Sequence, residues 1–508
     1  MKLVLHIIKK DARHLWPQIS VTIAILAALG REDRWRSDWL AGQTEGWLNL
    51  LLPLAWAFLI GLAVGQEPIA GDRQFWITRP YRRAGLLAAK LGFAVAFVHA
   101  PFFLEQSYVL AARGFSPLLY LPQLLWNQVL LFAALTLPAM ALAALASTFT
   151  QFVMEVVGVA AAMIFLRATF DTSPVPWQRV DTVRIGVTIS LVAVGSIAIA
   201  WMQYFGRRVK VSRGVGIAAG VAAGVVFAAM LPRSAFAVRS ALAPIPQAVA
   251  LAIDAPRPWP SLSPNSTTVV IPVVLSGMPD ASFHVESLGM RITGPGGVTY
   301  STPARPDQQS FDKIAFQGFH APGYDDPVHG WIHLQFAPDV YRQLKDAEVE
   351  ISGESGITAY RLGETTWMPA VGTAQTTLDG ICSTHAIQDR WSADLLKIEC
   401  ESPSEIPLPT RVRLWDSQTG RDWKARLGDG KAFVTGPRST WLTALDRRQT
   451  FFFLAEEPKP GWINTVPVRV LASAKIAITP EIVAGYSVLK YRLSGVKLSR
   501  YWVRPMQR

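Results

Sequence analysis

The first 231 residues of the chain consist largely of long apolar stretches, and shorter alternating runs replace them soon afterwards. A helix needs about 17 to 25 mostly apolar residues to cross the hydrocarbon layer of a membrane. Six stretches approach or reach this length: 46–65, 86–105, 121–147, 152–166, 185–204 and 214–231. A seventh, Pro17 to Gly30, is shorter and more polar. The pattern predicts an α-helical polytopic membrane domain with six or seven transmembrane helices.

The composition agrees with a membrane domain followed by soluble modules. Hydrophobic residues make up 50% of the 508 residues and charged residues only 17%, a balance that is unusual for a soluble protein. The net charge of +12 could indicate a nucleic-acid partner, but Lys and Arg fall between the apolar stretches and along the second half, without one basic patch. We interpret them as topology signals and expect no nucleic acid.

Positive charge beside the helix ends predicts the orientation, because cationic loops are retained in the cytoplasm. With the N-terminus inside, the cytoplasmic segments hold Lys2, Lys9, Lys10, Arg13, Arg73, Arg79, Arg82, Arg83, Lys90, Arg207, Arg208, Lys210 and Arg213. The opposite loop 31–45 balances its arginines with acidic residues. Seven crossings place the domain after Leu231 outside the cytoplasm. If the first stretch does not cross, the N-terminus starts outside and the rest is unchanged.

The first sixteen residues have an amphipathic pattern of their own. Apolar Leu3, Leu5, Ile7 and Ile8 alternate with charged residues, which predicts a helix along the cytoplasmic interface over 1–16. A cleaved signal peptide over residues 1–30 is the alternative, although its charges would lie unusually deep. The predicted division of the chain is therefore 1–16 interfacial helix, 17–234 membrane domain and 235–508 extracytoplasmic β-rich domain.

The most specific local sequence is QEPIAGDRQFWITRPYRRAGLLAAK, from Gln66 to Lys90. It resembles the cytoplasmic loop between the second and third membrane helices of type-2 ABC-transporter permeases. There, an acidic-aromatic stretch precedes Arg-Pro, a basic residue and Leu-Leu-x-x-Lys, and the segment forms a short helix that docks in a cleft of a separate ATPase. The matching residues are Asp72, Phe75, Trp76, Arg79, Pro80, Arg82 and Arg83. The alternative is that the arginines only anchor the helix ends and Trp76 is an interfacial aromatic.

The resemblance covers about residues 1–230 and implies the permease subunit of an ATP-driven exporter in a bacterial cytoplasmic (inner) membrane. It also implies two permeases, as a homodimer or heterodimer in the lipid bilayer, with two ATPase subunits. The chain has no Gly-x4-Gly-Lys-Ser/Thr phosphate loop, so we expect ATP hydrolysis by the partner, no cofactor and no enzyme activity in this chain. A seventh span and the long C-terminal domain depart from the family's usual six-span pattern.

Ionisable residues within apolar stretches are costly and are therefore candidate pathway groups. They are His99, Glu105 and Glu155. The alternative is that the two glutamates reach the headgroups and His99 bonds a neighbouring carbonyl. So few charges favour a lipid, peptide or other amphiphile as substrate over a small ion.

From about Val269 onward, short alternating runs predict strands. They lie at 269–275, 283–286, 331–336, 347–351, 411–415, 451–454 and 466–471. We expect an all-β, sandwich-like domain of one or two modules, with a boundary near 370–380. The stretch 472–508 has no assignment from its pattern.

The C-terminal domain offers little chemistry. Cys382 and Cys400 are the two cysteines of the chain, and an oxidising compartment would allow a disulfide between them, unless they lie too far apart. We expect no metal site at His320, His329 and His333, and no catalytic motif is present. The alternative function is a membrane-anchored sensor or scaffold whose β domain binds a ligand or partner. A membrane enzyme ranks third.

Overall fold

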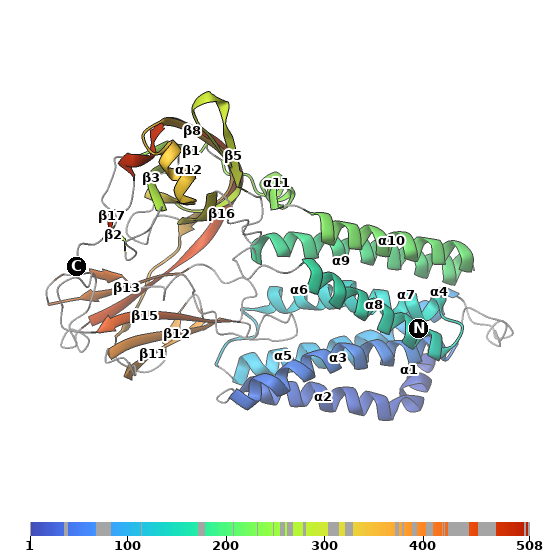
Figure 1. Ribbon diagram of the computed structural model, residues 1–508. Coiled ribbons are helices and arrows are strands. Elements are labelled where there is room, and N and C mark those ends of the chain that lie inside the picture. The colour runs from blue at the N-terminus through green and yellow to red at the C-terminus, as the bar shows by residue number, and fades with distance from the viewer. Residues whose placement is uncertain are drawn as a thin grey trace.

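The computed structural model places most of the chain. It describes residues 2–34, 39–67, 83–112, 114–170, 178–206, 208–230, 232–246, 248–254, 260–261, 268–277, 281–302, 314–320, 329–370, 375–377, 380–388, 394–402, 410–418, 420, 422–424, 447–455, 474–501 and 504–505. These residues form a helical part and a β part, and the β part lies beyond one end of the helices (Figure 1).

Each apolar stretch of the sequence falls on a helix. The helices are α1 (Lys2–His14), α2 (Trp16–Arg34), α3 (Trp39–Gly65), α4 (Arg83–Ala94), α5 (Ala100–Ala112), α6 (Leu121–Leu131), α7 (Leu137–Leu145), α8 (Phe149–Phe170), α9 (Gln178–Trp201), α10 (Val209–Ala229) and α11 (Pro232–Leu242). Within the described residues, five helical segments are long and apolar enough to cross a membrane. They are Arg83–Ala112, Leu121–Leu145, Phe149–Leu166, Val183–Gly206 and Val209–Ala229. The apolar parts of α2 and α3 are shorter.

Wider π-helical turns interrupt two of these segments, at Val95–His99 and Phe132–Thr136, and a third, Met202–Gly206, ends the segment Val183–Gly206. The first two lie just before Pro101 and Pro138. A proline has no N–H group and its ring clashes with the carbonyl four residues earlier, which here belongs to a residue inside the wider turn. A π-turn, with its bonds five residues apart, accommodates this.

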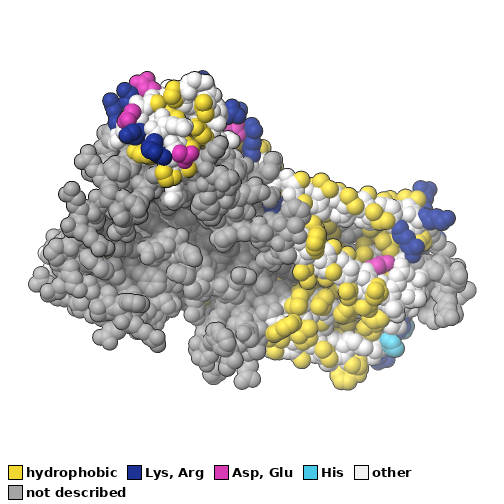
Figure 2. Space-filling view, viewed as in Figure 1, with side chains coloured by type: hydrophobic (Ala, Val, Ile, Leu, Met, Phe, Trp, Pro, Cys, Tyr) yellow, Lys and Arg dark blue, Asp and Glu magenta, His cyan; other side chains and the backbone are white. Residues whose placement is uncertain are grey.

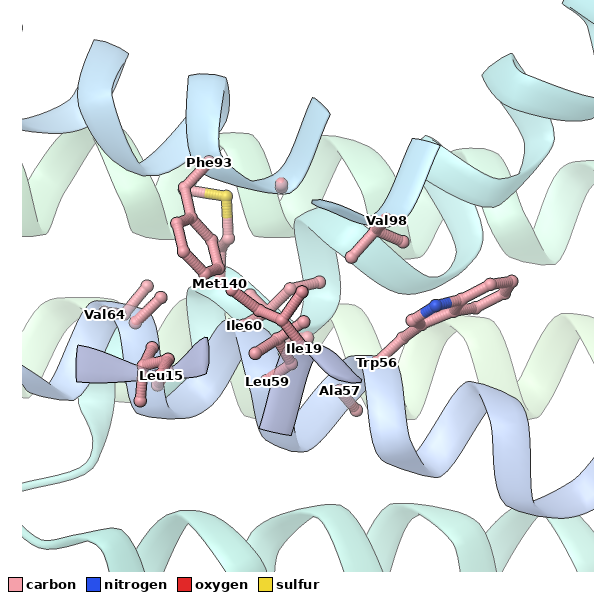
Figure 3. Close-up of a cluster of buried hydrophobic side chains, with 14 of the residues drawn as sticks. Leu15, Ile19, Trp56, Ala57, Leu59, Ile60, Val64, Phe93, Val98 and Met140 are labelled. Atoms are coloured by element: carbon pink, nitrogen blue, oxygen red, sulfur yellow. The ribbon is translucent and has the colours of Figure 1, made fainter. Parts of the chain in front are cut away.

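The core of the helical part lies among α2, α3, α4, α5, α7 and α8. Figure 3 shows Ile60, Phe93 and Met140 close together, with Trp56 and Val98 nearby. Small residues allow the close packing: a Cβ atom added to Gly61 of α3 would lie 2.2 Å from the Phe152 ring of α8. Exposed apolar side chains cover much of the outer surface (Figure 2). Helices that are apolar on their outer faces too are typical of a membrane environment.

The β part has strands of very different length. They are β1 (Ala250–Ile253), β2 (Pro260–Ser261), β3 (Thr268–Ser276), β4 (Ala281–Thr293), β5 (Thr299–Thr302), β6 (Ile314–His320), β7 (His329–Phe336), β8 (Glu348–Leu362), β9 (Thr366–Pro369), β10 (Gln375–Thr377), β11 (Gly380–Gln388), β12 (Asp394–Ser402), β13 (Thr410–Asp416), β14 (Asp422–Lys424), β15 (Arg447–Ala455), β16 (Ala474–Lys497) and β17 (Arg504–Pro505). A short helix, α12 (Pro338–Leu344), follows β7. The predicted run 466–471 lies outside the described residues.

The main sheets have the strand orders β1-β3-β7-β6, β10-β11-β12-β15 and β14-β13-β16-β8-β4-β5, with β9 also paired to β16. One hydrophobic core packs the first sheet against β4, β8 and β16. The stretch without a sequence assignment contains β16, which pairs with β13 and β9 in its first part and with β8 afterwards. The sheet β10-β11-β12-β15 begins near the predicted boundary at 370–380, but β16 pairs with strands from both sides of that boundary.

Helix α11 joins the helical and β parts. Phe236 of α11 is fully buried, and a Cβ atom added to Gly356 of β8 would lie 2.6 Å from its ring. The Nε atom of Arg233 lies 2.9 Å from Oε2 of Glu354. The β part is therefore packed against the end of the helical part and not merely tethered to it.

Candidate functional site

The two ends of the loop that follows α3 lie at the end of the helical part that is remote from the β part. Figure 1 shows α1 and the start of α4 at this end. The described residues of this loop are Gln66 and Glu67, and α4 begins at Arg83. The predicted coupling residues Asp72, Phe75, Trp76, Arg79, Pro80 and Arg82 lie outside the described residues. Arg83 is described, and its Nη1 atom donates to the Phe205 carbonyl oxygen at 2.8 Å.

Four charged side chains meet just after the end of α3, near the end of α1 and two turns into α4. We call Lys10, Asp11, Glu67 and Lys90 the charge cluster. The Nζ atom of Lys90 lies 2.8 Å from Oδ2 of Asp11, and Nζ of Lys10 lies 3.3 Å from Oδ1 of Asp11. Both lysines also donate to the Glu67 carboxylate. The cluster therefore connects α1, the end of α3 and α4 through two acids and two bases.

The charge cluster is buried to an unusual degree. The side chain of Asp11 has no exposed surface, that of Lys90 is 1% exposed, and Glu67 is 5% exposed. Lys10 lies at the edge, with 38% of its side chain exposed. Removing buried charges from water costs several kcal/mol per ion, so such groups persist only when each has a partner. Here the two carboxylates supply those partners to both lysines.

Within the charge cluster, Glu67 and Lys10 have shifted pKa values. Burial alone would raise the pKa of Glu67, but the charge of Lys90 and the hydrogen bonds from both lysines outweigh this and lower that pKa. Burial would lower the pKa of Lys10, but the hydrogen bond and charge of Glu67, with the charge of Asp11, raise it instead. Both shifts favour the ionised forms, so Glu67 and Lys10 are charged at neutral pH.

A small apolar cluster close to these charges contains residues from two further elements, α7 and the turn Met202–Gly206. It contains Ile7 of α1, Leu86 and Ala89 of α4, Ala144 of α7 and Tyr204 of the turn Met202–Gly206. The same turn contains Phe205, whose carbonyl accepts the bond from Arg83. A displacement of α4 at this end therefore acts on α1, α7 and the end of α9 through direct contacts.

From the sequence, we interpret Lys10 and Lys90 as topology signals, place Glu67 in the loop and Asp11 in the interfacial helix, and do not predict the contacts among them. Asp11 and Lys90 are 79 positions apart, and a sequence pattern does not specify such a contact. A usable signal was nonetheless present. Asp11 lies among the basic residues of the interfacial helix, and Glu67 directly follows the apolar stretch 46–65. Lys90 lies within the next apolar stretch, near the same membrane side.

His99, the first candidate pathway residue, is buried, and its partners are a side-chain amide carbonyl oxygen and a hydroxyl. Its Nδ1 atom lies 3.0 Å from Oε1 of Gln128, and its Nε2 atom lies 3.0 Å from Oγ1 of Thr136. His99 and Thr136 each end a π-turn, so this contact joins two irregular turns of neighbouring helices.

The two glutamates lie elsewhere. A Cβ atom added to Gly30 would lie 2.8 Å from Oε1 of Glu105, which brings Glu105 against the end of α2. Oε1 of Glu155 accepts a hydrogen bond of 2.8 Å from Gln151. Glu155 is bonded to Gln151, whereas His99 is bonded to Gln128 and Thr136, so these hydrogen bonds do not link the two candidate residues.

In the β part, the register of the β11–β12 pair sets Cys382 opposite Cys400, and Cys382 is buried and disulfide-bonded. His329 and His333 both lie on β7, and His320 ends β6. Within the described part of the chain, no group of three or more metal-ligating residues comes together.

Comparisons with known proteins do not extend this picture. The chain matches no family model, and no curated protein or solved structure is significantly similar to it.

Proposed function

We propose that the chain is the membrane subunit of an ATP-driven exporter of the ABC class, coupled to a separate ATPase through the loop 66–90. The observation that carries this proposal is the charge cluster. It fastens both ends of the loop to each other and to α1, through Glu67 on one side and Lys90 on the other. Buried charge pairs that hold the two sides of the loop together would suit a loop that transmits force.

In the proposed mechanism, closure of two ATPases pushes on the segment around Phe75 to Arg83. Because Glu67 and Lys90 share a hydrogen bond and both contact α1, the push displaces α1, α3 and α4 together. The bond from Arg83 to the Phe205 carbonyl extends the displacement to the end of α9. Paired subunits then rock, and a path opens between them.

The proposed orientation places this end of the helices in the cytoplasm. Exposed cations collect there, including Arg208, Lys210 and Arg213, and Figure 2 shows Lys and Arg gathered at the end remote from the β part. Basic residues beside helix ends favour the cytoplasmic side. The helices α2 to α10 then cross seven times and the β part lies outside, where an oxidising compartment suits the bonded Cys382.

The proposed substrate is an amphiphile, such as a lipid or a hydrophobic peptide. Few charges lie within the spans, and the buried polar contact of His99 with Gln128 and Thr136 is closed within one subunit. A small ion would need polar groups to replace its water, because an unsolvated ion in a hydrophobic interior is strongly destabilised.

The test of this proposal separates transport from membrane insertion. We expect Trp76→Ala and Arg79→Glu to abolish export while leaving the amount of inserted protein unchanged, because the proposed role of both side chains is the contact with the ATPase. Lys210→Gln is the matched control at the same membrane side, since Lys210 is exposed and lies outside the loop. Normal export by both loop variants would refute coupling through the loop and would favour the sensor or scaffold function.

A further inference from the structure

The outward face of α1 carries a second pattern, distinct from the charge cluster on its inner face. Lys2, Lys9 and Arg13 are all exposed, and their spacings of seven and four residues place them within about 40° of one another around the helix. The only acid of α1 is Asp11, which is buried and paired with Lys90. The outward face therefore presents cations with no acid of its own helix among them.

Large apolar side chains flank these cations. Leu5 is 70% exposed and Trp16, which follows α1 at the start of α2, is 64% exposed. With 100° per residue, Leu5 lies beside the cation stripe, and Trp16 is the first residue of the next helix. Long cationic side chains beside exposed leucine and tryptophan are typical of a helix in the headgroup layer, with apolar groups reaching toward the acyl chains.

If α2 lies in the bilayer, the membrane surface lies close to α1. Val21 and Ile23 of α2 are 57% and 45% exposed, so the apolar outer surface of α2 begins within two turns of Trp16. Along the chain, the cations of α1 come first, Trp16 follows, and the apolar Val21 and Ile23 come last. This is the order that a membrane interface imposes.

We propose that the outward face of α1 is a binding site for the headgroups of anionic phospholipids. Lys2, Lys9 and Arg13 contact the headgroup phosphates, and Leu5 and Trp16 insert beside the acyl chains. The phosphodiester of a zwitterionic lipid has its own choline or ethanolamine charge beside it, so an anionic lipid complements an acid-free cationic face better. This site holds α1 at a fixed depth while the inner face of the same helix is held by the charge cluster.

A label on the face itself measures this binding. The full chain with Leu5→Cys carries a fluorophore at that cysteine. It is placed in two preparations of phosphatidylcholine vesicles that contain the same small fraction of phosphatidylglycerol. Brominated phosphatidylglycerol or brominated phosphatidylcholine then quenches the label. Each cation near the surface contributes about a fivefold change in affinity for anionic lipid. We therefore expect at least about a fivefold preference for quenching by phosphatidylglycerol.

The variants decide whether the cations of α1 cause the preference. Lys2→Gln/Lys9→Gln/Arg13→Gln should make the two lipids quench equally, and Lys345→Gln/Lys490→Gln/Arg500→Gln, with three charges removed from the β part, should leave the preference unchanged. If the triple α1 variant does not fold, Lys9→Gln should lower the preference several-fold and Lys9→Arg should retain it.

Three results would overturn the proposed site. They are equal quenching by both lipids in the labelled chain without further substitutions, a preference that survives in the α1 variants, and no quenching by either lipid. The measurement needs no ATPase and no nucleotide. Its failure is therefore distinguishable from failure of the proposed transport function.

Discussion

At the scale of single residues, the charge cluster is the feature that most distinguishes this chain from a set of apolar spans. Asp11 and Lys90 are almost fully buried and bonded to each other at 2.8 Å, and Glu67 is bonded to both lysines. Each member depends on the others, because a buried charge without a partner is far less stable than a buried pair. Substitutions here should consequently be strongly coupled.

Lys90→Met should therefore destabilise the folded chain by about 3–5 kcal/mol, because it leaves two acids to share Lys10. Asp11→Asn/Lys90→Met should lose less than the sum of the single variants, since Lys10 and Glu67 remain paired. Thermal unfolding in detergent measures both. Lys210→Met, an exposed lysine at the same end, is the control. Additive losses would mean that Asp11 and Lys90 do not act as a pair.

The pH dependence of stability follows from the shifted groups. Glu67 has a lowered pKa in the folded chain, so its contribution is present above the unfolded value of about 4.3 and is lost as the pH falls through the folded value. Lys10 has a raised pKa, so its contribution is present below about 10.4 and is lost as the pH rises through the folded value. Unfolding midpoints across pH should show a plateau between these limits. Glu67→Gln should weaken the decline on the acid side, and an unchanged acid limb would contradict this assignment.

At the scale of helices and strands, sequence periodicity predicts an element well when its surroundings stay the same along its whole length. The apolar stretches were predictable because lipid-facing and core-facing residues of a span are both apolar, and each stretch falls on a helix. Strand β16 was missed because Pro480 and Gly485 interrupt its pattern, while its neighbours change from β13 and β9 to β8 along its length. The charge cluster was missed for a different reason, since its pairs join residues far apart in the chain.

The packing of α3 on α8 gives a prediction at this scale. Gly61→Ala should destabilise the helical part by about 1–3 kcal/mol through overpacking, because the new Cβ atom would lie 2.2 Å from the Phe152 ring. Gly158→Ala of α8, where nothing lies within 4 Å of the added atom, is the matched control and should be neutral or slightly stabilising. Equal unfolding midpoints for both variants would show that α3 and α8 do not pack this closely.

At the scale of the whole molecule, the helical part and the β part are joined by packing. Phe236 of α11 is buried against Gly356 of β8, and the backbone N–H of Tyr486 donates to the Ala243 carbonyl at 2.8 Å. A rocking motion of the helices would therefore carry β8 and β16 with it. The long strand β16 would extend that motion to β13 and β9. The division into two parts was predictable from the change in hydropathy, whereas this junction depends on contacts that the sequence pattern does not specify.

Phe236→Ala should loosen the junction without unfolding either part. The lost burial of a large aromatic side chain costs about 3–5 kcal/mol, and the local opening should appear as faster proteolysis between α11 and β1 in membranes. Val238→Ala, at a partly exposed position of the same helix, should be cut at the original rate. Unchanged cleavage of the Phe236 variant would contradict a packed junction.

The central claim is that this chain works with a separate ATPase through the loop 66–90. The most direct measurement is purification of the chain from its native membrane in mild detergent, followed by identification and quantification of every protein that remains bound. We predict an ATPase with a Walker phosphate loop in an amount comparable to the chain, and its loss after Trp76→Ala/Arg79→Glu. A chain that retains no ATPase, under conditions in which other ABC complexes stay intact, would contradict the claim.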